Sequence, residues 1–114
     1  MLLAFFVALL HAQAVETIPS PEGRAAALSY VAAMDCAAEF ARTSSLARNS
    51  VERIPQEAVE QCTEARDFAA QDMLAAIPDT ERLLAQNNIS ARMRVAAADV
   101  LIARLEHGDY PGMA

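Results

Sequence analysis

The side chains with the most chemical potential in this 114-residue chain are two cysteines, Cys36 and Cys62, and the histidine His107. A thiol becomes a nucleophile when a histidine or carboxylate lies beside it, and cysteine–histidine clusters bind zinc. Asp35 precedes Cys36, but adjacent residues of a helix point about 100° apart. The other histidine, His11, lies in an apolar N-terminal segment. We therefore expect no catalytic residues, no metal site and no cofactor.

The spacing of the cysteines favours a disulfide. Cys36 and Cys62 each lie thirteen residues from Asn49, so a chain reversal near Asn49 brings them level on two antiparallel helices. Small neighbours let those helices approach to the Cα separation of about 4.4–6.8 Å that a disulfide requires. These neighbours are Ser29, Ala33, Ala58, Ala65 and Ala69. We predict a Cys36–Cys62 bridge, and the alternative is two buried free thiols.

Helices must position this pair, because alanine is abundant and β-branched residues are few. Ser20 followed by Pro21 is typical of a helix N-terminus, and Pro55 and Pro78 mark two further starts. His107-Gly108 is a good C-terminal stop. The chain is predicted to be all-α, an antiparallel three-helix bundle whose first two helices form a disulfide-joined hairpin. The predicted helices span 21–47, 55–77 and 79–107, and the third is either continuous or broken at Asn87-Asn88.

The N-terminal segment 1–14 predicts export. Leu2 to Leu10 is an uninterrupted apolar run, too short for a permanent membrane span, and Ala12-Gln13-Ala14 fits signal-peptidase cleavage. The alternative is an N-terminal helix buried in the core. We expect a signal peptide at 1–14, a flexible lead-in at 15–20, a helical domain at 21–107 and a loose tail at 108–114. The mature protein is then periplasmic or secreted from a bacterium, with no stable membrane span.

The predicted helices at 21–47 and 79–107 are apolar around more of their circumference than a three-helix bundle can cover. Charged residues form one narrow stripe on each helix, and large apolar residues lie around the rest. The extra surface predicts contact with a protein partner or with a second copy. The candidate residues of this surface are Tyr30, Val31, Met34, Met93, Val95 and Ile102.

The helix predicted at 55–77 is an ordinary amphipathic helix. Its apolar face consists of Ala58, Val59, Cys62, Ala65, Ala69, Met73 and Ile77, and its opposite face is acidic. One helix face spreads its carboxylates too far apart for a hard-cation site, so a solvated face is favoured. The net charge of −6 argues against nucleic acid as a partner.

A resemblance to known proteins follows from Tyr30, Cys36, Ala41, Ala58 and Cys62. Over about residues 24–77, the chain resembles small secreted alanine-rich helical proteins of GC-rich proteobacteria that contain one cysteine pair. That resemblance implies an exported protein with a disulfide hairpin and assigns no activity. The segment "MDCAAEFARTSSLA" is also similar to the cysteine-bearing part of the lysozyme-inhibitor LprI family, which uses more cysteines.

Together these features predict a non-enzymatic exported helical protein that acts by protein contact or self-association. The alternative is a periplasmic inhibitor of a basic cell-wall hydrolase such as lysozyme, which would bind the acidic face of the second helix.

Overall fold

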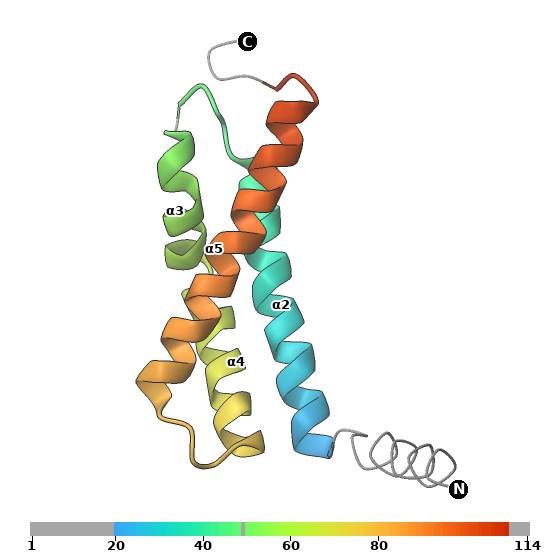
Figure 1. The fold of residues 1–114 in the computed structure, drawn as a ribbon, viewed down its shortest axis with the longest axis vertical. Helices are drawn as coiled ribbons and strands as arrows, with labels where there is room; N and C mark the ends of the chain where they lie inside the picture. Colours follow the sequence, from blue (N-terminus) through green and yellow to red (C-terminus); the bar gives the residue numbers. More distant parts are fainter. Residues whose placement is uncertain (1–19, 49, 110–114) are drawn as a thin grey trace, which may run out of the picture.

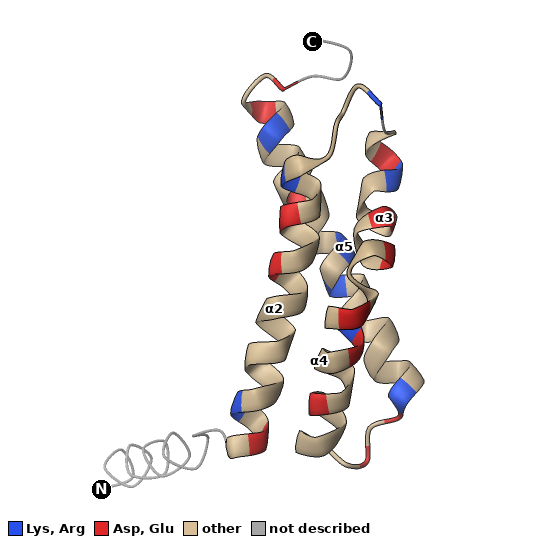
Figure 2. Cartoon of the chain, turned by 180° about the vertical axis from the view of Figure 1, so that it is seen from behind, with Lys and Arg blue, Asp and Glu red and all other residues tan. Residues whose placement is uncertain are grey.

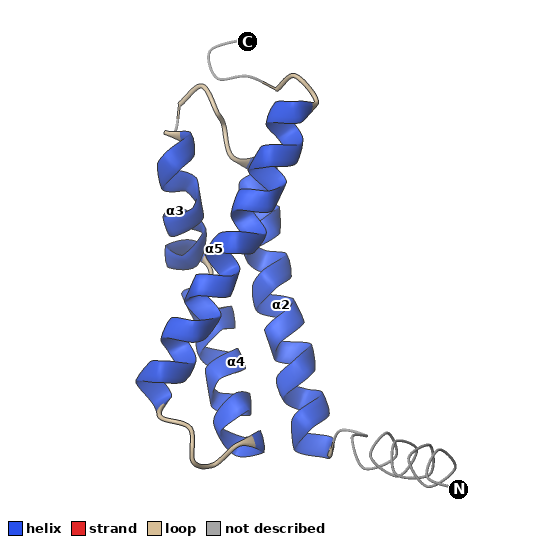
Figure 3. Cartoon of the chain, viewed as in Figure 1, coloured by secondary structure: helices blue, strands red, loops and turns tan. Residues whose placement is uncertain are grey.

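The structure, a computed structural model, describes residues 20–48 and 50–109. The expected signal peptide, the lead-in at 15–19 and the tail from 110 onward lie outside the described residues. The described part consists of helices joined by loops and contains no strand, in agreement with the predicted all-α class (Figure 3). Its elements are the α-helices α2 (Pro21–Thr43), α3 (Ile54–Gln61), α4 (Thr63–Ala76) and α5 (Arg82–Glu106), and the 3-10 helix η1 (Val51–Arg53).

The helices run lengthwise beside one another (Figure 1). α3 and α4 follow one another down one side of the molecule, α2 lies next to them, and α5 packs against all three. Figure 1 shows that the chain reverses direction after α2 and again after α4. None of the helices in the described ranges is long and apolar enough to cross a membrane.

The beginning of α2 agrees with the sequence prediction. The Ser20 side chain accepts a hydrogen bond of 3.0 Å from the backbone N–H of Gly23, and Pro21 occupies the first turn. This bond satisfies one of the amide groups that a helix N-terminus leaves without an intrahelical partner.

α2 ends at Thr43, four residues before the predicted end at 47. The Thr43 hydroxyl donates to the carbonyl of Glu39 (3.0 Å), and the Ser44 hydroxyl donates to the carbonyl of Phe40 (2.6 Å). Hydroxyl side chains of this kind compete with the backbone for the last carbonyls of a helix. The early end also turns Leu46 into the core, where it is buried.

The helix predicted at 55–77 is divided into α3 and α4 at Cys62, so the prediction of one continuous helix was wrong. Cys62 has φ −108° and ψ 26°, outside the helical range. The Thr63 hydroxyl donates to the carbonyls of Val59 (3.2 Å) and Glu60 (2.9 Å). No glycine or proline lies at this break, and the competing threonine hydroxyl is the local cause that we identify.

α5 begins at Arg82 rather than at 79, because Thr80 first forms a turn with the carbonyl of Ile77. The helix then continues through Asn87-Asn88 without a break. Both asparagines are exposed, while Ile89, the next residue, is fully buried. Burial of the inner face therefore holds the helix together at this position.

The end of α5 is stopped at Gly108 as predicted. Gly108 has a φ of 86°, a left-handed conformation that glycine adopts without steric cost. The amides of Gly108 and Asp109 donate to the carbonyls of Leu105 and Arg104, respectively, which is the pattern of a Schellman motif. Gly108 and Asp109, expected to begin the loose tail, are thus bonded to the helix.

The core is built largely from alanine. Of the fifteen apolar residues that are buried in the described part, eight are alanine. The largest fully buried side chains are Ile54, Ile89 and Met93. An alanine core brings helix backbones close together but removes little apolar area from water per residue. Stability in such a domain depends strongly on each larger side chain and on covalent links.

Candidate functional site

The predicted disulfide between Cys36 and Cys62 is present. It joins the middle of α2 to the junction of α3 and α4, with a Cα–Cα distance of 6.0 Å. Cys62 is buried, and Cys36 is half-buried against the core. The bridge fixes the register of α2 against α3 and α4, and neither cysteine keeps a free thiol.

A shallow groove of about 500 Å³ runs beside the disulfide between α2 and the chain from Gln61 to Phe68. Its lining is mostly apolar and open to solvent. Phe68 lies at its rim with 57% of its surface exposed. Ser29 of α2 donates a hydrogen bond to the Asp72 carboxylate of α4 on the same side. The lining residues are Ser29, Ala32, Cys36, Gln61, Cys62, Glu64, Ala65 and Phe68.

The outer surface of α3 and α4 is acidic. These two helices contain five carboxylates and one arginine, and Figure 2 shows acidic segments along both of them. The arginine, Arg66, forms an ion pair with Asp67 (3.0 Å) and donates to Ser90 of α5 (3.3 Å). Glu60 and Glu64 make no ion pair within the described ranges. These two carboxylates are available to a cationic partner.

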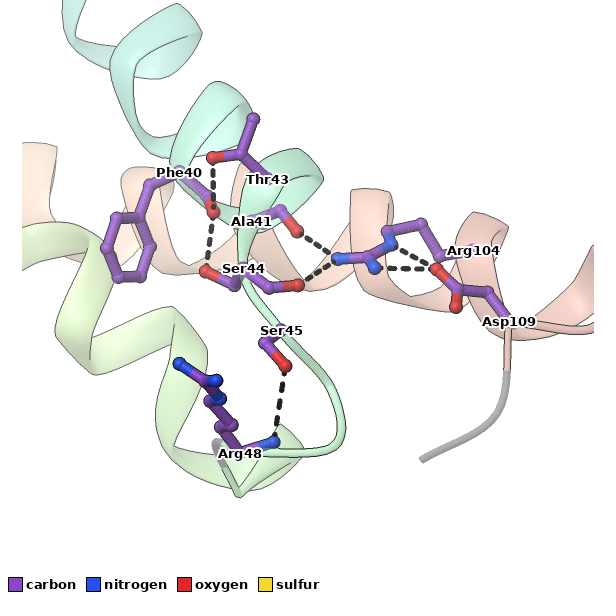
Figure 4. Close-up of polar contacts among 8 residues, drawn as sticks. All are labelled: Phe40, Ala41, Thr43, Ser44, Ser45, Arg48, Arg104 and Asp109. Atoms are coloured by element: carbon purple, nitrogen blue, oxygen red, sulfur yellow. Dashed lines mark hydrogen bonds and ion pairs between the residues drawn. The ribbon is translucent and has the colours of Figure 1, made fainter. Parts of the chain in front are cut away.

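One arginine has a structural function that the sequence did not reveal. Arg104 of α5 reaches the end of α2 and donates to the carbonyls of Ala41 (2.8 Å) and Ser44 (2.7 Å) (Figure 4). It also pairs with Asp109 at 2.6 Å. Its guanidinium therefore satisfies carbonyls that the end of α2 leaves without helical partners. Ala41 and Ser44 lie 63 and 60 positions before Arg104 in the sequence, so no local sequence signal identifies this contact.

The candidate surface residues are divided by the fold. Val31, Val95 and Ile102 are more than half exposed, whereas Tyr30 and Met34 are half-buried against the core. Met93 was assigned wrongly, because it is 0% exposed and is one of the three largest fully buried side chains. Met93 lies one turn from Ile89 on the inner face of α5.

Further large apolar side chains are exposed that the sequence interpretation did not single out. They are Leu28, Phe68, Ile77, Leu83 and Leu84, each more than half exposed. Ile77 was expected on the buried face of the second helix, but α4 ends at Ala76 and the chain turns away there. The adjacent pair Leu83-Leu84 lies in the first turn of α5, and both side chains are exposed.

The described residues show no arrangement suited to metal binding, since no three histidine, cysteine or acidic side chains converge there. Every buried side-chain nitrogen or oxygen in this part has a hydrogen-bond partner.

Comparisons with protein-family models, with curated proteins and with solved structures find no significant match. The features of the described residues that bear on function are the disulfide, the groove, the acidic surface and the exposed apolar side chains.

Proposed function

We propose that the protein is a non-enzymatic, exported helical protein that acts by contact with another protein or with a second copy. The domain is then an antiparallel bundle of three rods, in which α3 and α4 together form the second rod and the disulfide fixes its place. A disulfide is typical of proteins from oxidising compartments such as the periplasm. This supports the export predicted from residues 1–14.

The observation that carries the proposal is that eight large apolar side chains of the described residues are exposed, around a small alanine core. Single exposed apolar residues are normal on protein surfaces. Here three of them, Leu84, Val95 and Ile102, share one face of α5, and Leu83 adjoins the first. Apolar side chains grouped in this way mark contact surfaces.

A second candidate function is binding to a basic cell-wall hydrolase as an inhibitor. It is favoured by the acidic surface of α3 and α4 together with Phe68 at the rim of the groove. An apolar side chain surrounded by carboxylates fits a target that presents arginines or lysines around an apolar pocket.

Capture from periplasmic extract on immobilised protein tests both candidates. We expect the wild-type protein to retain a partner that the Val95→Gln/Ile102→Gln variant fails to retain, since glutamine preserves helix propensity but removes the apolar contact. For the second candidate, the expected result is capture of a basic hydrolase that is lost at high salt and in Glu60→Gln/Glu64→Gln. Equal retention by all three proteins, or retention of nothing together with a monomer at every concentration, contradicts the proposal.

A further inference from the structure

We propose that the outer face of α5 pairs with the same face of a second copy in an antiparallel arrangement. The inference rests on the proposed function and deepens it, because it names the surface through which the protein self-associates and the partner, a second copy of this chain. The face, here called the outer seam, consists of Leu84, Asn88, Ala91, Val95, Ala98 and Ile102. These residues follow one another at alternating steps of four and three, which is the spacing of a helix–helix contact.

The outer seam is turned away from the core of its own domain. The inner face of α5 buries Ala85, Ile89, Met93, Ala97 and Leu101. On the seam, Leu84, Val95 and Ile102 are 62%, 54% and 53% exposed, and none of its six residues is buried. In Figure 1, α5 lies in front of the other helices, so its outer side is open to a second molecule.

Side-chain size favours an antiparallel pair. When two copies of α5 are aligned about a two-fold axis between Ala96 and Ala97, Val95 lies opposite Ala98 of the second copy. Ile102 then lies opposite Ala91 of the second copy. Each of these two β-branched side chains is matched with a small one, which lets the two helices approach closely and fill the space between them. A parallel pair would instead oppose alanine with alanine and leave gaps.

The charged residues beside the seam also favour an antiparallel pair. Arg92 and Asp99 flank the seam on one side, seven residues apart. The same antiparallel alignment brings Arg92 beside Asp99 of the second copy, and the two-fold symmetry creates this ion pair twice. Neither side chain makes an ion pair within the described part of its own chain. Arg94, which a parallel pair would bring near Asp99 of the second copy, already donates to Gln56 of α3 at 3.3 Å. The surface is therefore self-complementary in the antiparallel sense.

Sedimentation of the purified, disulfide-bonded protein over a range of concentrations tests the pairing. The wild-type protein is expected to form a dimer that dissociates on dilution, because the seam is short. Arg92→Asp and Asp99→Arg are each expected to raise the dissociation constant of the dimer at least tenfold, since each places two like charges in contact across the interface. An equimolar mixture of the two variants is expected to restore it, because every charge then meets its opposite.

The readouts separate this inference from the proposed function. Both substituted residues are exposed, so the helical circular dichroism of the dilute variants should match that of the wild type, which excludes misfolding as the cause. Weakening by Arg94→Asp but not by Arg92→Asp overturns the antiparallel arrangement in favour of a parallel one. A wild-type protein that remains monomeric at every concentration overturns the pairing altogether. The proposed function is still tested independently, by comparing what the wild-type protein and Val95→Gln/Ile102→Gln capture from periplasmic extract.

Discussion

Cys36→Ser is expected to lower the free energy of unfolding by roughly 3–4 kcal/mol, because the bridge closes a loop between residues that are 26 positions apart. The bridge reduces the conformational freedom of the unfolded chain far more than that of the folded one. In a small domain with an alanine core, this is a large part of the total stability. The melting temperature should fall by well over about 10 °C, as measured by circular dichroism.

The matched control for this substitution is its partner. Cys62→Ser should destabilise the protein by the same amount, and the double variant should be no less stable than either single one, because all three remove the same bond. Thiol titration of the denatured, oxidised protein should detect no free thiol. Two reactive thiols per chain would show that the disulfide is absent in solution and that the stability has another origin.

Met93→Ala is expected to cost about 2–5 kcal/mol, the range for removal of a fully buried large side chain. Met93 is 0% exposed, and eight of the fifteen buried apolar residues of the described part are alanines, which have no side-chain freedom to fill the vacated space. Chemical denaturation followed by circular dichroism measures the change. Leu84→Ala provides the control, since Leu84 lies on the same helix but is largely exposed. If the two substitutions cost the same, the assignment of inner and outer faces on α5 is incorrect.

Short-range signals in the sequence predicted much of the fold. Ser20 and Pro21 specify the start of α2 through one side-chain hydrogen bond and one fixed backbone angle, and Gly108 ends α5 by adopting a positive φ. The symmetric placement of Cys36 and Cys62 about the first connection was sufficient to predict their bridge. Each of these features depends on residues that are neighbours in the chain or on one simple reversal of it.

Long-range contacts account for what the sequence did not reveal. Arg104 contacts the end of α2 only because α5 packs beside it. The apolar surface of α5 was recognised, but Met93 was assigned to its outside, since helical periodicity alone does not say which of several apolar faces turns inward. The break at Cys62 follows from the Thr63 hydroxyl, whose choice between solvent and the preceding carbonyls depends on its surroundings.

Folding leaves Leu84, Val95 and Ile102 of α5 outside the core, where they are available for binding. The free energy of unfolding of Val95→Gln/Ile102→Gln, measured by denaturation at high dilution, tests this claim most directly. We expect a change of no more than about 1 kcal/mol from the wild type, because exposed positions contribute little to folding. A loss comparable to that caused by Met93→Ala would contradict it, since these side chains would then be part of the core.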